Sequence, residues 1–268
     1  MLLANCATHA SLKTVYYDLP LGEPARNERQ TIIIVLLSDL HSDIYGEDQT
    51  PVLERINEVS PDIIVLSGDI YDNRASPLGT RLLLAGLPPS VPVFYVTGNH
   101  EYDCGKVDEI MRELSDFGVT VLSDDHVALT VKRARLVIAG KEDPNKRLAD
   151  PSYDGASAEG PLREAALPGA YRILVCHRPE IAKLYAPYGF DLLLSGHTHG
   201  GQIRLPPLVN GLYAPGQGLF PKYSGGVYGI GGAVLVVSRG LTTRRPFIPR
   251  IFNPPELVVL RLVPGPSY

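Results

Sequence analysis

Two histidines that stand two residues apart, His197 and His199, follow the apolar run Leu192–Leu194 in a segment with three glycines. Neutral imidazole is a common ligand for zinc, iron and manganese, and glycines permit the tight backbone path that brings ligands together. Such a pair also occurs in ordinary polar loops, so this segment alone leaves both interpretations open. The remaining histidines decide between them.

Five of the seven histidines fall at or just after the ends of predicted strands, together with two aspartates and one asparagine. Taken singly, each has an ordinary alternative: an Asp after a strand is often a cap or turn residue, and a lone His is often a core or loop residue. A cluster of such side chains at one sheet edge is costly unless something binds it, which favours a metal site. The residues are Asp39, His41, Asp69, Asn99, His100, His177, His197 and His199.

The elements that must position these residues follow a strand–loop–helix rhythm. Continuous apolar runs predict buried strands, and apolar residues at helical spacing predict helices between them. The predicted strands are 31–37, 63–66 and 91–96, and the predicted helices are 52–59, 81–84 and 107–117. Polar residues follow each strand at its carboxyl end, where open α/β sheets build their sites.

The second half of the chain is predicted to be mostly β structure. Shorter strand patterns at 127–131 and 136–139 indicate a hairpin or edge in a second sheet. The stretch 141–170 is rich in charge, Pro, Gly and Ala, and we interpret it as a long surface excursion with a short helix at 162–166. Further strands are predicted at 173–176, 190–194, 232–237 and 257–262.

Composition sets wider limits on the protein. Of its 268 residues, 44% are hydrophobic and 20% charged, as in globular proteins, and we expect an N-terminal extension over 1–30, partly strand or loop, followed by one domain over 31–268. A net charge of −4 argues against a nucleic-acid-binding module. Three widely spaced cysteines indicate neither a disulfide framework nor a cysteine zinc site.

The N-terminal residues contain no run long enough to span a bilayer and no signal-peptide pattern. The chain as written is therefore expected to be cytoplasmic. A peripheral membrane or cell-envelope location stays open for the case in which a native N-terminal segment was trimmed.

The ordered motifs resemble the five signature blocks of the calcineurin-like metallophosphoesterases, over about Ile32 to Gln202. Two later motifs, Ser238-Arg239-Gly240 and Asn253-Pro254-Pro255-Glu256, are more narrowly similar to the bacterial YkuE/YaeI-type branch. The five blocks are Asp39-x-His41, Gly68-Asp69, Gly98-Asn99-His100-Glu101, His177 and Gly196-His197-Thr198-His199.

The resemblance implies a four-layer α/β/β/α sandwich of two mixed sheets, with the metal site at the carboxyl ends of the strands. It also implies two divalent metal ions, drawn from Mn, Fe, Zn, Co or Ni, that are bridged by Asp69, whose carboxylate can bind two cations through its two oxygens. His100 is implied to be catalytic together with Asp69, because it lies beside a ligand and can stabilise phosphoryl charge or protonate the leaving oxygen. The remaining ligands would be Asp39, His41 and His199 for one ion and Asn99, His177 and His197 for the other.

The implied activity is hydrolysis of a phosphoester, most specifically a phosphodiester, by attack of a hydroxide that bridges the two metals. One alternative is a lipid-linked pyrophosphate hydrolase of the UDP-2,3-diacylglucosamine type. Another is a non-catalytic metal-binding scaffold, which is disfavoured because no expected ligand position is lost.

The expected partner is a phosphoester substrate, with a lipid-linked or cell-envelope substrate left open. Apolar Leu205–Leu208 and basic Arg244, Arg245 and Arg250 could serve a lipid or anionic head groups. An ordinary loop and a solvated surface explain them as well, and we prefer that interpretation.

Overall fold

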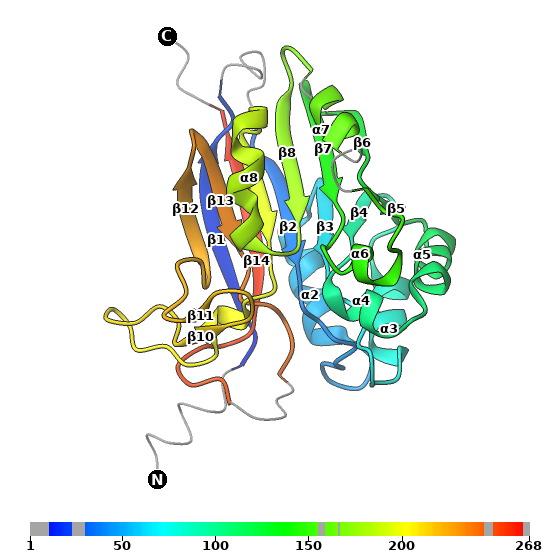
Figure 1. The fold of residues 1–268 in the computed structure, drawn as a ribbon, viewed down its shortest axis with the longest axis vertical. Coiled ribbons are helices and arrows are strands. Elements are labelled where there is room, and N and C mark those ends of the chain that lie inside the picture. The colour runs from blue at the N-terminus through cyan, green and yellow to red at the C-terminus, as the bar shows by residue number, and fades with distance from the viewer. Residues whose placement is uncertain (1–10, 23–29, 155–158, 166, 244–248, 265–268) are drawn as a thin grey trace.

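Two six-stranded sheets form the centre of the protein (Figure 1). The computed structural model describes residues 11–22, 30–154, 159–165, 167–243 and 249–264. The first sheet contains, in spatial order, β1 (Lys13–Pro20), β14 (Glu256–Val263), β2 (Ile32–Leu37), β3 (Ile63–Ser67), β4 (Val93–Val96) and β5 (Thr120–Val121). The second contains β12 (Gly226–Ile230), β13 (Ala233–Val237), β9 (Leu192–Ser195), β8 (Tyr171–Cys176), β7 (Ala134–Lys141) and β6 (His126–Val131).

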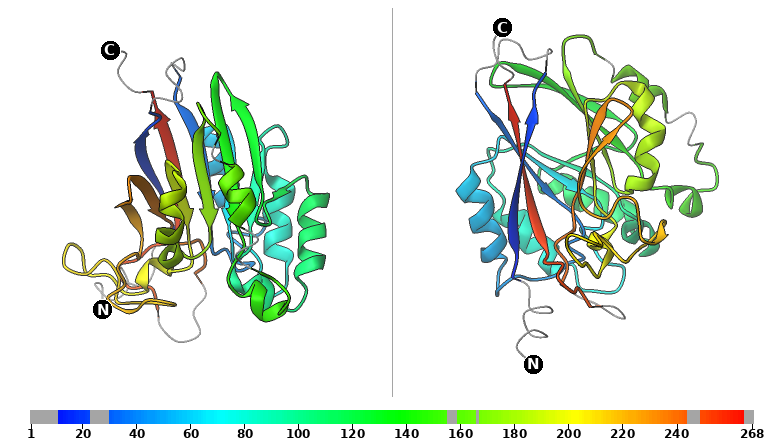
Figure 2. Two further views of the ribbon diagram at one scale, coloured as in Figure 1. Left: turned by 45° about the horizontal axis from the view of Figure 1, so that its top comes forward. Right: turned by 90° about the vertical axis from the view of Figure 1, so that its left-hand side faces the viewer.

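Helices cover the outer faces of both sheets, so the molecule has four layers, as the right panel of Figure 2 shows. The first sheet is covered by α2 (Thr50–Val59), α3 (Leu78–Gly86) and α5 (Val107–Asp116), and the second by α7 (Glu159–Glu164) and α8 (Ala182–Tyr185). This arrangement confirms the predicted α/β/β/α sandwich of two mixed sheets. Among the described residues, no helix has the length and apolar character needed to cross a bilayer.

Strand β2 shows why the sequence reads as an unbroken apolar run. Ile34 and Leu36 lie in the core between the two sheets, whereas Val35 and Leu37 lie in the core under the helices. Because successive side chains of a strand point to opposite faces, a strand covered on both faces must be apolar at every position.

The described part of the predicted N-terminal extension is an edge strand of the first sheet. All eight residues of β1 pair in parallel with β14. Residues 1–10 and 23–29 lie outside the described part of the chain. The division of the chain at residue 30 stays a prediction.

The stretch 141–170 differs from its prediction as a surface excursion. Lys141, Glu142 and Asp143 are buried, because β7 continues to Lys141 and each charge has a partner: Lys141 Nζ lies 2.7 Å from Asp124 Oδ1, for example. Composition alone cannot show such pairing. Beyond Asp143 the structure has α6 (Lys146–Ala149) and then α7, which begins and ends earlier than the predicted helix at 162–166; residue 166 is not described.

Two smaller differences also have local causes. The predicted strand 91–96 begins only at Val93, since Pro92 has no backbone N–H to donate to a ladder. A five-residue helix, α4 (Asn99–Asp103), begins within the third motif and was not predicted, because one helical turn is too short to show periodicity.

Candidate metal centre

The five strands that precede the predicted ligands end at one edge of the sandwich, and the predicted ligands meet there. The first sheet contributes the residues after β2, β3 and β4, and the second sheet contributes those after β8 and β9. Among the described residues, three groups of side chains have ligand atoms within 4.8 Å of one another, and one of them is His41, Asp72 and His100. We call the other two the first and second clusters. The first cluster is Asp39, His41 and His199, and the second cluster is Asp69, His177 and His197.

In the second cluster three ligand atoms face one point. His177 Nε2 lies 3.2 Å from Asp69 Oδ2 and 3.2 Å from His197 Nδ1. His177 Nδ1 lies 2.8 Å from the carbonyl oxygen of Ser67, which can only accept, so Nδ1 carries a proton and Nε2 is the nitrogen that can bind a metal. Ligand atoms about 2.0–2.1 Å from a tetrahedral metal are roughly 3.3 Å apart, which these distances match.

The first cluster is more open. Asp39 Oδ1 lies 3.6 Å from His199 Nε2, and the His41 and His199 rings stack with centroids 5.2 Å apart. Asp39 also connects the two sheets, since its carboxylate accepts the backbone N–H of His197 at 3.0 Å. Ligands from both sheets are thereby fixed relative to one another.

A single oxygen of Asp69 faces both clusters. Oδ2 lies 3.2 Å from His177 Nε2 and 3.7 Å from His41 Nε2. Oδ1 accepts the backbone N–H of His100 at 2.9 Å. Oδ2 is therefore the oxygen that faces histidines of both clusters, and the role of Asp69 as a ligand of two ions stays a prediction.

Several buried polar atoms at this edge have no hydrogen-bond partner in the described structure, and two of them are Asn99 Oδ1 and His41 Nε2. Buried polar atoms without partners are costly, and both belong to predicted ligands. A cation would satisfy both atoms. The residues present thus fit a pair of metal ions.

The backbone at the site is unusual. Five of the predicted ligands have left-handed backbone angles, which non-glycine residues rarely adopt; they are Asp39, His41, Asp69, His197 and His199, with φ between 46° and 70°. Neighbouring glycines make room for them, since a Cβ on Gly98 would lie 2.1 Å from Asp69 Oδ1 and one on Gly196 would lie 1.7 Å from Ser38 Oγ.

Charge coupling in the second cluster is strong. Burial alone would lower the pKa of His177, but the neighbouring Asp69 outweighs it and raises that pKa to about 10. Burial alone would raise the pKa of Asp69, but His177 holds it well below its usual range. In the metal-free protein the two form a buried ion pair, and a metal must displace the His177 proton.

Asp72 belongs to the site although the sequence analysis gave it no role. Its Oδ2 lies 3.4 Å from His41 Nδ1 and 3.7 Å from His100 Nδ1. It therefore orients one predicted ligand and the predicted catalytic histidine, so that His41 keeps Nε2 for a metal. Its place three residues after Asp69 in the same loop is the sequence signal that could have revealed it.

Glu101 is a second residue whose role the sequence did not show. Its buried carboxylate accepts the backbone N–H groups of Gly98, Asp69, Ile70 and Tyr71 at 2.8–3.1 Å. It thus fixes the loop that carries Asp69 against the loop that carries Asn99. This role depends on two loops meeting, which no local pattern reveals.

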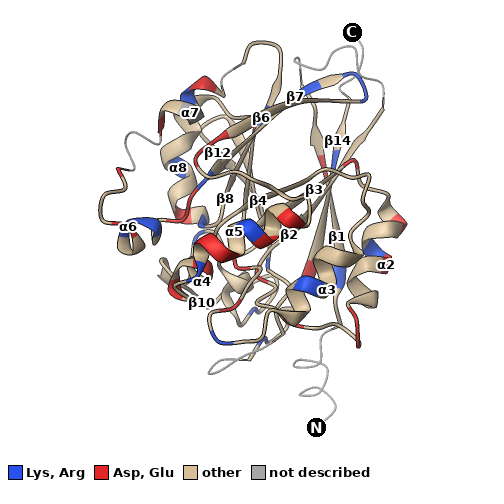
Figure 3. Cartoon of the chain, turned by 90° about the vertical axis from the view of Figure 1, so that its right-hand side faces the viewer, with Lys and Arg blue, Asp and Glu red and all other residues tan. Residues whose placement is uncertain are grey.

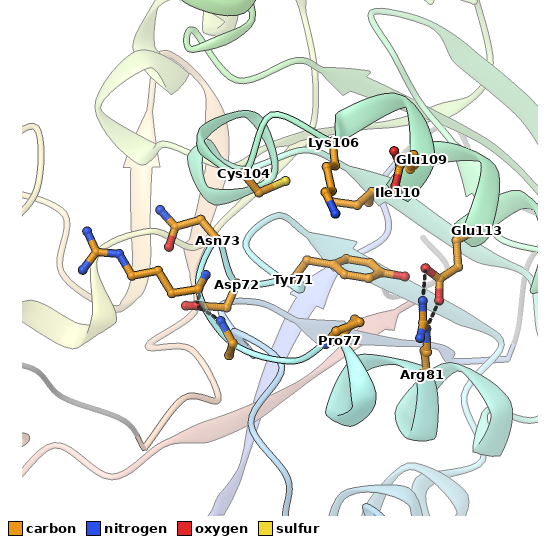
Figure 4. A pocket seen from close by; sticks show the side chains of 12 residues that line it. Tyr71, Asp72, Asn73, Pro77, Arg81, Cys104, Lys106, Glu109, Ile110 and Glu113 are labelled. Carbon is orange, nitrogen blue, oxygen red and sulfur yellow. Dashed lines mark hydrogen bonds and ion pairs between the residues drawn. The ribbon is translucent and has the colours of Figure 1, made fainter.

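A pocket of about 270 Å³ opens beside Asp72 (Figure 4). The Tyr71 ring lies between Pro77 on one side and Cys104 and Lys106 on the other, and the Arg81–Glu113 ion pair lies beyond its hydroxyl. Because Asp72 faces His41 and His100, this pocket adjoins the predicted metal centre.

The two later motifs, Ser238-Arg239-Gly240 and Asn253-Pro254-Pro255-Glu256, form hydrogen bonds next to the loops that carry the predicted ligands. Arg239 donates from its backbone N–H and from Nη1 to the buried Glu256, at 3.0 and 2.8 Å. Asn253 donates to the carbonyl oxygens of His199 and Gln202 at 2.7 and 3.2 Å.

One of the three basic residues expected on a solvated surface, Arg250, differs from that expectation. Arg250 is buried, with Nη2 donating to the Gly240 carbonyl oxygen at 3.3 Å. Arg244 and Arg245 lie outside the described residues.

Comparison with known proteins agrees with this geometry. The chain is 33% identical over 239 residues to the uncharacterized metallophosphoesterase YkuE of Bacillus subtilis (strain 168), covering 85% of this chain and 78% of that protein. It is 29% identical over 210 residues to phosphodiesterase YaeI of Escherichia coli (strain K12), covering 77% and 72%. Over 249 residues it is 32% identical to a Bos taurus protein named transmembrane protein with metallophosphoesterase domain, covering 85% of this chain and 55% of that protein, so it spans about half of that relative.

Solved structures share the fold at low sequence identity. The NAD nucleotidase NadN of Haemophilus influenzae superimposes with a TM-score of 0.56 at 16% identity, covering 79% of this chain and 45% of that chain. GAP50, the anchor in the inner membrane complex of Plasmodium, gives 0.53 at 13% identity, covering 87% and 81%.

The family model for calcineurin-like phosphoesterases matches residues 32–201, from the first residue of β2 to the glycines after His199. This span contains every predicted ligand. The chain therefore belongs to the calcineurin-like phosphoesterase family.

Proposed function

We propose that the protein is a phosphodiesterase that binds two divalent metal ions. Family membership indicates a phosphoester hydrolase, and the relative named phosphodiesterase YaeI suggests a diester substrate. The observation that carries the proposal is that Asp69 Oδ2 lies near a histidine of each cluster, 3.2 Å from His177 Nε2 and 3.7 Å from His41 Nε2. A carboxylate that bridges two ions holds them close enough to act on one phosphate.

The nitrogen and oxygen donors, without a thiolate, suit manganese, iron, zinc, cobalt or nickel. Two such ions would polarise the phosphoryl oxygens and lower the pKa of a water molecule so that it attacks at neutral pH. The residues proposed to hold them are Asp39, His41 and His199 for one ion, Asn99, His177 and His197 for the other, and Asp69 for both.

His100 is the proposed group for the phosphate itself. Its side chain is 29% exposed, and Nδ1 faces Asp72, which leaves Nε2 for the substrate. Burial lowers the pKa of His100, while Asp69 and Asp72 oppose that change. The ring is thus placed either to stabilise phosphoryl charge or to donate a proton to the leaving oxygen.

The pocket beside Asp72 is proposed to hold the leaving group, because it lies next to His100. Asn73 and Lys106 on its wall suit a polar leaving group, and the Tyr71 ring, Pro77 and Ile110 add apolar contact.

A metal-by-substrate screen tests the proposed function. The metal-free protein is loaded with each of the five metals and assayed with bis-p-nitrophenyl phosphate, p-nitrophenyl phosphate and a UDP-linked lipid. We expect the diester to be hydrolysed fastest, and Asp69→Asn, but not the exposed Asp125→Asn, to abolish turnover. If all three substrates stay intact while metal binds, the protein is a scaffold and the proposal is wrong.

A further inference from the structure

Large apolar side chains are exposed on the loops that follow the metal-ligand segment. We call five of them the apolar loop surface: Leu205, Leu208, Leu219, Phe220 and Phe252, which are 51%, 80%, 67%, 66% and 46% exposed. Single exposed apolar residues are ordinary, but a group of them on one face marks an interaction site.

Backbone hydrogen bonds bring these loops together. The N–H of Arg204 donates to the Ile251 carbonyl oxygen at 3.0 Å, so the segment that carries Leu205 runs beside the segment that carries Phe252. The N–H of Leu212 donates to Ile203 at 2.9 Å, and that of Phe220 donates to Leu212 at 2.8 Å. Figures 1 and 2 show these loops, with β10 (Tyr213–Ala214) and β11 (Gly218–Leu219), projecting from one end of the sandwich.

The loop that carries Leu208 is held in a defined shape. Leu205 and Val209 exchange two backbone hydrogen bonds of 2.8 and 2.9 Å, and Leu208 donates to Leu205 at 2.7 Å. Two prolines, Pro206 and Pro207, lie between them. Because the loop is already ordered, docking through it would lose little conformational entropy.

The charged residues within these loops are all basic, and one carboxylate from another element lies against them: a Cβ on Gly216 would lie 2.2 Å from Glu180 Oε1. The sequence from Leu192 to Pro255 contains no Asp or Glu, although the whole chain has a net charge of −4. Lys222 is exposed and Arg204 half-buried within the same loops. Acidic residues lie on other elements, such as α4 and α5 in Figure 3.

We propose that the apolar loop surface docks on an anionic lipid bilayer, with its leucines and phenylalanines in the interface and Lys222 and Arg204 beside the head groups. Apolar side chains flanked by cations are the combination that binds such surfaces. A symmetric contact between two copies would instead bring their cations together without any carboxylate from these loops to neutralise them.

Docking in this way would turn the metal centre towards the bilayer. The loops are hydrogen-bonded to the segment that carries His197 and His199. The backbone N–H of Leu212 donates to the Gly201 carbonyl oxygen at 2.9 Å, and the side-chain amide of Asn253 donates to the His199 carbonyl oxygen at 2.7 Å. The orientation of the site relative to the lipid is thus set by the same hydrogen bonds that position His199.

Vesicle flotation of the full chain tests the proposal. Phosphatidylcholine vesicles with and without phosphatidylglycerol are used as probes. The wild type should float with the anionic vesicles, and Leu208→Ser/Leu219→Ser should lower its partition coefficient about tenfold or more, since two large side chains no longer leave water. Leu148→Ser/Leu184→Ser is the matched control, with 80% and 58% exposed leucines on α6 and α8, and should bind like the wild type. Lys222→Glu should weaken binding to the anionic vesicles alone.

Absence of wild-type binding, or equal binding of wild type and Leu208→Ser/Leu219→Ser, would overturn the proposal. Sedimentation velocity tests whether the surface instead joins two copies of the chain. A wild-type dimer that is lost in Leu208→Ser/Leu219→Ser would show this and overturn the proposal. Binding is measured without metal or substrate. Hydrolysis of bis-p-nitrophenyl phosphate, assayed separately, shows whether the proposed function fails independently of docking.

Discussion

At the scale of single residues, Asp69 is the side chain that we propose to bind both metal ions. Its Oδ2 faces a histidine of each cluster, and its Oδ1 is held by the backbone N–H of His100. A residue with one free oxygen for two ions cannot be replaced without disturbing both, whereas each histidine belongs to one cluster.

Substitution at Asp69 and at His41 should therefore differ in metal stoichiometry. Asp69→Asn is expected to weaken the binding of both metal ions, because the amide lacks the negative charge that offsets two cations. His41→Ala is expected to weaken chiefly the binding of one metal ion. Elemental analysis after dialysis measures both. One metal per fully loaded wild-type chain would contradict the binuclear site.

His100→Asn should separate catalysis from metal binding. We expect both metals and the fold to remain while turnover of an alkyl phosphodiester falls about 10²–10⁴-fold, the usual contribution of a general acid. A nitrophenolate leaves with little help. The defect should therefore shrink with a nitrophenyl diester if the ring protonates the leaving oxygen, and stay similar if the ring stabilises phosphoryl charge.

Two results would reject that role for His100. Equal activity of His100→Asn and wild type on both substrates would exclude either contribution. Loss of one metal in the variant would show that His100 is a ligand.

The seven predicted ligands and His100 could be named from sequence because each stands next to the end of an apolar run. The structure brings all eight to one edge. Asp72 and Glu101 escaped prediction because their roles are contacts between loops distant in sequence: Asp72 faces His41 and His100, and Glu101 binds backbone N–H groups of two loops.

At the scale of elements, the Arg239–Glu256 ion pair connects the end of β13 to the start of β14. Both side chains are buried, and Leu241 and Thr242 just beyond Arg239 donate backbone hydrogen bonds to Ser38 and Asp39 at 2.9 and 2.7 Å. The pair thus supports the loop of a predicted ligand without touching it.

Glu256→Ala should lower the free energy of unfolding by about 3–5 kcal/mol, because it leaves the Arg239 charge buried without its partner. Glu113→Ala is the matched control. It breaks the more exposed Arg81–Glu113 pair and should cost at most about 1 kcal/mol. Urea unfolding of the metal-loaded proteins measures both, and equal costs would contradict the supporting role of Glu256.

The main strands could be predicted because burial on two faces leaves a continuous apolar run, as in β2 and β3. The elements that were missed are short or depend on pairing. The two-residue strands β10 and β11 carry no period, and the end of β7 is a charged segment whose burial rests on ion pairs.

At the scale of the whole molecule, the metal ions should act as ligands of the folded state. A metal at about 100 times its dissociation constant adds about 2.7 kcal/mol, or roughly 5–10 °C in Tm for a chain of this size. Scanning calorimetry with manganese and with EDTA measures the difference. In Asp69→Asn the Tm should no longer respond to metal.

The difference in Tm between the protein with manganese and the protein with EDTA should increase from pH 6 to pH 8. The pKa of His177 is raised to about 10 in the metal-free fold, so its proton stabilises that fold fully below the usual value near 6.5, and the stabilisation is lost as the pH rises through 10. Metal binding requires the deprotonated ring and strengthens over the same range. A difference in Tm that decreases as the pH rises from 6 to 8 would contradict the Asp69–His177 ion pair.

The left-handed backbone at five predicted ligands has a consequence for the history of the sequence. Glycine would have less backbone strain than Asp or His at each of these positions, since glycine adopts such angles without steric cost. Selection for thermal stability alone, in the absence of metal, would therefore replace the ligands first. Asp and His at all five positions are therefore what we expect if their side chains serve the proposed metal site at a cost in backbone strain.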